Sequence, residues 1–145
     1  MEIKFANPRQ VSLPVACAGV KRAARIFLKY SKVKRGSLSV VLLDGASMRR
    51  LNKRRLGHDF VTDVITFDLR DNAALPMDAE IFICPAEARR NAHIYKEPVR
   101  RELLRYLAHG ILHLLGYDDA TVQERNVMHL KEDEMLSWLS SRRKR

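Results

Sequence analysis

Two histidines, His109 and His113, stand four residues apart in the apolar stretch AHGILHLLGYDD. On a helix this spacing places both imidazole rings on one face, where their nitrogens can bind a single metal ion. The pair alone is a weak signal, because histidines at this spacing also occur as ordinary buried or surface residues. A metal site and a plain apolar helix are both compatible with it.

The residues that follow the pair favour a metal site. Gly116 can end the helix in a left-handed conformation and turn the chain back toward the histidine face. Asp119 then occupies the place of a third ligand, in the order H-x3-H-x2-G-x2-D. Metzincin proteases use this geometry, with a third histidine in the last place. We predict that His109, His113 and Asp119 bind one divalent metal ion, with one open position for catalysis.

Two neighbouring residues bear on the chemistry. Metzincins carry a glutamate general base directly after the first histidine, whereas this chain has Gly110, which argues against peptide hydrolysis. Asp118 could act as a general base, or it could hold a ligand histidine or cap a turn, and we favour the role of holding a ligand histidine. His58, His93 and His129 do not stand at a metal-ligand spacing from other candidate ligands, and we expect them at the surface.

Periodicity and turn residues predict the elements that must position these side chains. Strands are expected over 3–5, 37–43, 61–69 and 79–85, and helices over 12–30, 46–57, 86–95, 99–116 and from 121 toward 138. No helical pattern separates the strands 61–69 and 79–85, so we expect an antiparallel or loop-joined pair. The predicted fold is a single α+β domain over 1–145, a short mixed sheet with five helices and a metzincin-like metal helix.

The charge of the chain indicates a polyanionic partner. The 145 residues carry a formal net charge of +10, and residues 20–55 hold twelve basic side chains against one acidic side chain, Asp44. Nucleic acid is the simplest partner for such a surface, although a solvated basic surface without that partner is the alternative. We expect residues 138–145, which end in SRRKR, to form a flexible basic tail that adds RNA affinity.

Other sequence features point to a cytoplasmic location. No apolar run approaches the ~20 residues of a membrane span, so no membrane association is expected. The first ten residues lack the pattern of a secretion signal. Cys17 and Cys84 are far apart and are expected to be reduced, mostly buried thiols.

Three blocks of the sequence resemble the YbeY family of bacterial endoribonucleases. HGILHLLGYD, at 109–118, is similar to the family signature H-G-x-L-H-L-x-G-Y-D, which continues with a third histidine where this chain has Asp119. LNKRRLGHDFVTDVITF, at 51–67, is similar to LN-x-x-[YF]-R-G-x-D-x-P-T-D-V-L-S-F. AEIFIC, at 79–84, is similar to G-D-I-x-I-[SC]. The resemblance extends over most of the chain, from Ser37 to Leu136.

The resemblance implies a zinc-dependent hydrolase of single-stranded RNA. It implies a role in 3′-end maturation of small-subunit (16S) ribosomal RNA and in ribosome quality control, with ribosomal RNA and the small subunit as partners. It also implies a metal helix beside a short mixed sheet. The oligomeric state is not predicted, and the attacking group could be water or the 2′-OH of the RNA.

The chain departs from the family pattern at two functional positions. Asp119 adds a negative charge to the ligand set, which should make the bound metal a weaker acid and favour harder ions such as Mn²⁺ somewhat more. The family's basic-patch arginine falls on Leu56, while Arg54 and Arg55 precede it. We predict that Arg54 and Arg55 contact RNA and offset transition-state charge, although each helical step turns a side chain by about 100°.

Three function classes therefore stay open. The first, which we favour, is a metal-dependent endoribonuclease. The second is a ribosome-associated RNA-binding protein with a structural metal and little catalysis, which Leu56 keeps in play. The third is a metal-dependent hydrolase of another substrate, peptide included, against which Gly110 argues.

Overall fold

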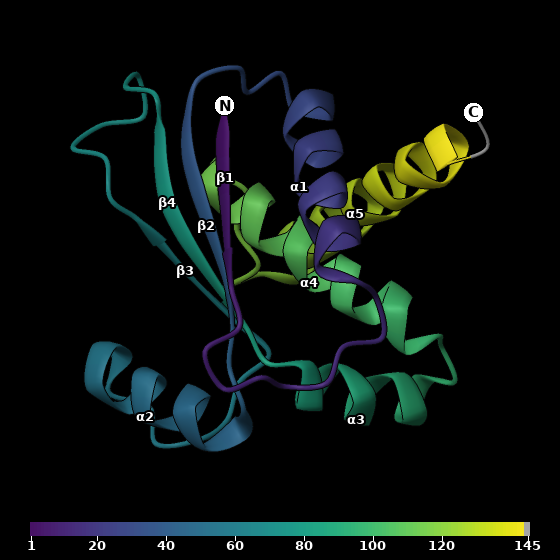
Figure 1. The fold of residues 1–145 in the computed structure, drawn as a ribbon. Helices are drawn as coiled ribbons and strands as arrows, with labels where there is room; N and C mark the ends of the chain where they lie inside the picture. The colour runs from purple at the N-terminus through teal and green to yellow at the C-terminus, as the bar shows by residue number, and fades with distance from the viewer. Residues whose placement is uncertain (144–145) are drawn as a thin grey trace.

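A four-stranded sheet forms the centre of the computed structural model, which describes residues 1–143 (Figure 1). Its strands are β1 (Glu2–Ala6), β2 (Gly36–Leu42), β3 (Val64–Asp68) and β4 (Met77–Ile83), in the order β1-β2-β4-β3. The β1, β2 and β4 strands are parallel, whereas β3 runs antiparallel to β4 with Val64 opposite Ile83. The strand pair predicted around the 70–78 loop is therefore antiparallel.

Five helices accompany the sheet in this single α+β domain, as the sequence predicted. They are α1 (Cys17–Tyr30), α2 (Gly45–Leu56), α3 (Pro85–Tyr95), α4 (Val99–Leu114) and α5 (Val122–Arg143). The start of α1 was predicted five residues too early: Pro14 disfavours helical geometry in Leu13, and Ala16 is extended, with a ψ of 152°, so that the helix begins at Cys17. The predicted capping box before α5 is present, with Thr121 and Glu124 each donating a backbone N–H to the other's side chain at 3.1 Å.

The C-terminal helix is longer than the sequence predicted. Residues 138–143, expected within a flexible tail, continue α5, and the other tail residues, 144–145, lie outside the described part. Leu139 packs in the core beside Met135 and Leu136, and the Arg142 guanidinium lies 3.5 Å from the centre of the Trp138 ring. These contacts hold the helix in place beyond the point where the apolar periodicity alone suggested an end.

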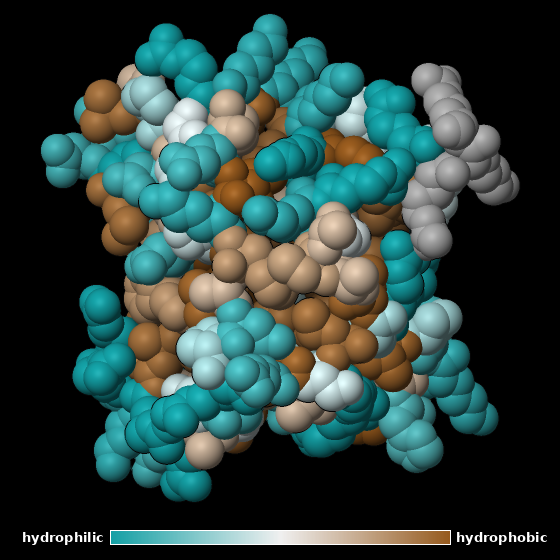
Figure 2. All heavy atoms as spheres, in the orientation of Figure 1, coloured by the Kyte–Doolittle hydropathy of each residue, from teal (hydrophilic) through white to brown (hydrophobic). Residues whose placement is uncertain are grey.

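The core lies between one face of the sheet and the helices α1, α4 and α5. Leu38, Val40 and Leu42 alternate along β2 with half-buried residues, so they share the face that meets these helices. Helix α2 packs on a smaller cluster at the opposite face, where Met48 and Leu51 meet side chains of β3. Figure 2 shows hydrophilic side chains at the margins of one side of the molecule and a band of apolar atoms between them.

The two cysteines differ in exposure. Both are free thiols, but Cys84 is buried and Cys17 is exposed, so the expectation of mostly buried thiols holds for Cys84 alone. Cys17 is the first residue of α1, and the first buried residue of that helix is Val20.

Within residues 1–143, no helix combines the length and the hydropathy that crossing a lipid bilayer requires.

Candidate metal centre

Helix α4 presents the two histidines on successive turns, and it packs closely on the sheet. A Cβ atom at Gly110 would lie 3.0 Å from Ile81 Cγ2 and 3.1 Å from Thr66 Cγ2, so only glycine fits there without displacing the sheet residues. The His109 and His113 rings stand at 81° to each other with centroids 4.6 Å apart, and both are partly exposed. The face of α4 that carries them therefore opens beside the sheet.

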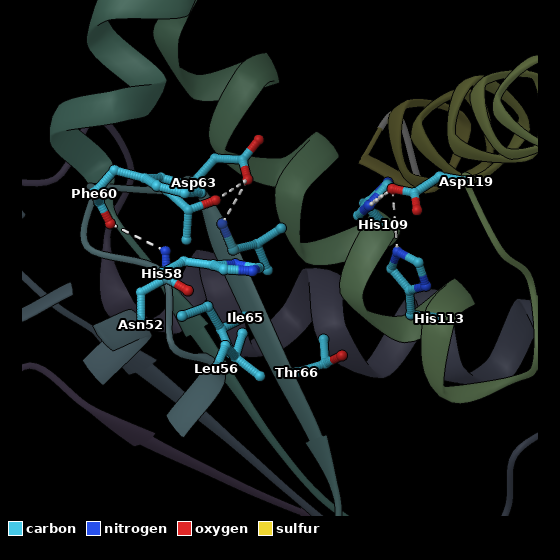
Figure 3. A pocket seen from close by; sticks show the side chains of 12 residues that line it. Asn52, Leu56, His58, Phe60, Asp63, Ile65, Thr66, His109, His113 and Asp119 are labelled. Atoms are coloured by element: carbon cyan, nitrogen blue, oxygen red, sulfur yellow. Dashed lines mark hydrogen bonds and ion pairs between the residues drawn. The ribbon is translucent and has the colours of Figure 1, made fainter. Parts of the chain in front are cut away.

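The turn after α4 returns the chain to the histidine face. Gly116 has a φ of +99°, the positive value that the sequence predicted, and its N–H donates to His113 O at 3.0 Å. Asp119 follows, with its carbonyl oxygen accepting a hydrogen bond from Arg125 Nη1 at 3.2 Å. This turn places the Asp119 carboxylate over the two imidazoles (Figure 3).

The three predicted ligands converge. Asp119 Oδ2 lies 3.3 Å from His109 Nε2 and 3.4 Å from His113 Nε2. One ligand atom from each residue lies within 4.8 Å of the others. Zinc held at about 2.0–2.1 Å in a tetrahedron needs ligands roughly 3.4 Å apart, and it takes imidazole nitrogen and carboxylate oxygen. The chemistry and the spacing of these donors therefore fit a divalent metal ion.

A buried glutamate orients one of the histidines. Glu132 of α5 is 5% exposed, and its Oε2 lies 2.7 Å from His109 Nδ1. With a proton on Nδ1 donated to this carboxylate, His109 Nε2 keeps its lone pair for a ligand bond. Arg105 Nη1 donates to the other oxygen of Glu132 at 3.1 Å, and Arg105 Nη2 donates to Asp133 at 2.7 Å. The two helices thus supply a hydrogen-bonded support behind the site.

This environment changes the basicity of His109. Burial alone lowers the pKa of its imidazole, but the hydrogen bond to Glu132 and the charges of Glu132, Asp119 and Asp63 together outweigh burial. The pKa of His109 is therefore raised above its ordinary value. A metal ion that binds this imidazole therefore competes with a proton that is held more tightly than on an ordinary histidine.

The supporting hydrogen bond that was predicted for Asp118 comes instead from Glu132, whose Oε2 lies 2.7 Å from His109 Nδ1. Asp118 is exposed and has no hydrogen bond or ion pair with any residue of the described part. Glu132 lies 23 residues from His109, so local spacing could not link them. The available signal was the helical spacing of Met128, Glu132 and Met135, which places one acidic side chain on the apolar face of the last helix.

A cleft of about 320 Å³ opens in front of the histidines (Figure 3). One wall carries His109, His113 and Asp119, and the other comes from the end of α2, the loop that follows it, and β3. The side chains of this second wall and of the floor are Asn52, Leu56, His58, Phe60, Thr62, Asp63, Val64, Ile65 and Thr66.

Neither of the arginines that were predicted to contact RNA lines this cleft. Arg54 lies beside a separate hollow together with Arg9 and Arg50. The Arg55 guanidinium lies 5.3 Å from the centre of the Phe67 ring. Leu56, the next residue of the helix, does line the cleft and is 49% exposed. The turn of about 100° per residue is the reason that one position faces the cleft and its two predecessors do not.

His58 was not predicted to lie at the site. It is exposed, as expected, but it lines the cleft opposite the candidate ligands. His93 and His129 are exposed as well, and His129 Nδ1 lies 3.4 Å from Arg105 Nη1. The available signal was Phe60, which follows His58 by two residues and places a second aromatic ring in the loop after α2.

Comparisons with known proteins show which family the sequence matches. The family model described as Endoribonuclease YbeY matches residues 5–140. Endoribonuclease YbeY of Chlorobium phaeovibrioides is 38% identical over 141 residues, which cover 97% of this chain and 93% of the relative. Endoribonuclease YbeY of Elusimicrobium minutum is 39% identical over 115 residues, 77% of each chain.

A solved structure supports the fold. The solution structure of a Thermotoga maritima protein superposes with a TM-score of 0.69, at 23% identity, over 98% of this chain and 91% of that one. The family relationship rests on the match of the family model over residues 5–140 and on the 38–39% identity with the two relatives. The chain belongs to the YbeY family of endoribonucleases.

Proposed function

We propose that this chain is a metal-dependent endoribonuclease that cleaves single-stranded RNA and holds Zn²⁺ through His109, His113 and Asp119. The observation that carries the proposal is the approach of His109 Nε2 and His113 Nε2 to one oxygen of Asp119, at 3.3 and 3.4 Å. Membership of the YbeY endoribonuclease family supplies the reaction class.

The residues around the site have separable tasks. A bound zinc ion supplies Lewis acidity toward water or a phosphoryl oxygen. Glu132 fixes the ring of His109 so that Nε2 faces Asp119. The carboxylate of Asp119 brings negative charge to the ligand set, which moderates that acidity and suits harder divalent ions as well.

The biological setting that we propose is the ribosome. It comprises 3′-end maturation of 16S ribosomal RNA and ribosome quality control in the cytoplasm, with ribosomal RNA and the small subunit as partners. The net charge of +10 supports an RNA-rich partner. Arg54 and Arg55 are exposed on α2, and in this proposal they bind RNA backbone outside the cleft.

One observation favours a second candidate function. Among the described residues that line the cleft there is no lysine or arginine, and Leu56 occupies the family's arginine position. Phosphoryl transfer usually depends on cations that offset transition-state charge. An RNA-binding protein with a structural metal and little catalysis is therefore the alternative.

Cleavage assays separate the two candidates. Zinc-loaded protein should cleave a single-stranded RNA oligonucleotide, and a chelator should abolish cleavage. His113→Ala should also be inactive while it still binds the RNA. If zinc-loaded wild type leaves the RNA intact and binds it as tightly as His113→Ala does, the structural-metal alternative holds.

Metal analysis tests the ligand set itself. Asp119→Ala should lose stoichiometric zinc, whereas Asp118→Ala should retain it, because only Asp119 lies within reach of both histidines. Zinc loss in the Asp118 variant alone would refute the assignment.

A further inference from the structure

The wall of the cleft that faces the candidate metal ligands carries two large, exposed apolar side chains, Leu56 and Phe60. Phe60 is 54% exposed and Leu56 is 49% exposed, and both lie beside His58 at the mouth of the cleft. In Figure 3 these three residues lie across the cleft from His109, His113 and Asp119. Large apolar side chains left open at a cleft mark a surface that a ligand covers.

Two aromatic rings on this wall are aligned. The His58 and Phe60 rings are stacked, at 10° to each other with centroids 5.4 Å apart. Nearly parallel, offset rings present flat faces, which is the geometry that a third ring can extend. Every nucleobase has such a face, and aromatic side chains bind unpaired bases by stacking.

The loop that carries the rings is fixed from both ends. Gly57 ends α2 with a φ of +74°, and the His58 N–H donates to Asn52 O at 3.3 Å. The buried Asn52 side chain donates from Nδ2 to Phe60 O at 3.0 Å. Asp59, which stands between His58 and Phe60 in the sequence, accepts a hydrogen bond from Arg49 Nε at 2.8 Å. Because the backbone of the loop is held in this way, it does not have to be ordered when a ligand binds.

The charges of the cleft also favour a base over a phosphate on this wall. The carboxylates that line the cleft are Asp63 and Asp119, and the described lining residues include no lysine or arginine. The lining of the cleft therefore offers a phosphate no cation on the loop side, because Arg49 and Lys53 lie outside the lining and pair with Asp59. An uncharged base face needs no such partner. Phosphate is left to the opposite wall, where the three metal-ligand candidates lie.

We propose that His58 and Phe60 form a stacking subsite for one unpaired nucleobase of the RNA substrate, with Leu56 closing its edge. This inference rests on the proposed function and adds to it the feature that the enzyme recognises. A cleft of about 320 Å³ is at the small end of ligand pockets, which suits one nucleotide. A base inside a duplex cannot offer its face, so the subsite would also select single strands.

Substitutions at Phe60 test the subsite. Phe60→Ala should weaken binding of a single-stranded RNA oligonucleotide to zinc-loaded protein by about 5- to 150-fold, the range of one base-aromatic stack. Phe60→Leu should weaken it nearly as much, because it keeps an apolar side chain without a flat face. Phe60→Tyr should bind like wild type. Tyr95→Ala is the matched control, since Tyr95 is 69% exposed at the end of α3 and does not line the cleft.

Removing a base from the RNA provides the complementary measurement. Abasic sites introduced one at a time should weaken wild-type binding most at one position, and Phe60→Ala should abolish that positional difference. A 2-aminopurine at the same position should be quenched by wild type and by Phe60→Tyr, but not by Phe60→Leu. Equal binding by wild type and Phe60→Ala, with cleavage intact, would overturn the subsite alone. No RNA binding or cleavage by wild type would overturn the proposed function and the subsite together.

Discussion

The Nδ1 atom of His109 lies 2.7 Å from Oε2 of Glu132, and this contact joins α4 to α5 directly behind the candidate metal site. Glu132 is almost fully buried, and its other oxygen accepts from Arg105 at 3.1 Å. A buried carboxylate paired on both sides is held in one position, and so is the ring that it contacts.

Removal of the Glu132 charge should therefore weaken metal binding. Glu132→Gln is expected to lower zinc affinity about 10- to 100-fold, the usual cost of losing a partner behind a ligand histidine. Competition with a chromophoric chelator measures the affinity. Glu97→Gln removes the same charge from an exposed position before α4 and should leave the affinity unchanged. Equal affinities for all three proteins would show that Glu132 does not support the ligand.

The raised pKa of His109 predicts a pH dependence in metal-free protein. Its folded-state pKa exceeds the ordinary value of about 6.5, so the stabilisation from protonated His109 is fully present below that value. It is lost as pH rises through the folded-state pKa. Zinc binding should strengthen over the same interval, because the imidazole must lose its proton first.

NMR titration of the imidazole resonances checks this expectation. His109 should titrate above 6.5 in chelator-treated wild type, and Glu132→Gln should move the transition to lower pH, since burial alone lowers the pKa. A transition that stays in place in the variant would mean that Glu132 does not set the basicity of His109.

The parts of the site that local sequence could predict are those that lie within one helix and its turn. His109 and His113 share a face because four residues make about one helical turn, and Gly116 has the positive φ that glycine favours. These two facts bring Asp119 to the histidines. The same reasoning located the antiparallel pair β3 and β4, because no helical pattern lies between them.

Contacts between distant elements were beyond sequence reasoning. The pairing of Glu132 with His109 depends on how α5 crosses α4, which local periodicity does not encode. The direction of Arg54 and Arg55 depends on the phase of α2, since a shift of one residue moves a side chain by about 100°. The cleft wall formed by His58 and Phe60 likewise exists only once α2 lies beside β3.

The close approach of α4 to the sheet gives a prediction for Gly110. Gly110→Glu should lower the free energy of unfolding by about 3 kcal/mol or more, because any Cβ atom there meets Ile81 and Thr66 and the carboxylate would be buried. Urea denaturation measures the loss. The variant should gain no peptidase activity, since its side chain would point at the sheet. An undiminished stability would show that the helix can move away from the sheet.

A second stability prediction concerns Arg70, which ties β3 to the end of α4. Its side chain is 8% exposed, and it donates to both oxygens of Asp68 at 2.9 and 2.8 Å and to Leu114 O at 3.0 Å. Lysine cannot make this set of hydrogen bonds. Arg70→Lys should therefore lower the free energy of unfolding by about 1–3 kcal/mol at neutral pH.

Low pH should reduce the difference in the free energy of unfolding between wild type and Arg70→Lys. The hydrogen bonds from Arg70 hold the pKa of Asp68 below its ordinary value, so their stabilisation is present above about pH 4 and is lost as pH falls through the folded-state pKa. Denaturation curves at pH 7 and pH 3 make the comparison. If wild type and Arg70→Lys differ in the free energy of unfolding by the same amount at pH 7 and pH 3, the Asp68 carboxylate is not the source of the stabilisation.

Leu56 stands where the family pattern has arginine, and it lines the cleft at 49% exposure. Leu56→Arg should therefore add one cation within reach of bound RNA. Each phosphate contact to a single strand contributes about 0.7 to the slope of log K against log[salt], so the variant should bind more tightly at low salt with a slope steeper by about that amount. Leu69→Arg adds the same charge at an equally exposed leucine outside the cleft and should change the slope much less. Equal slopes for the two variants would show that the gain comes from net charge and not from the cleft.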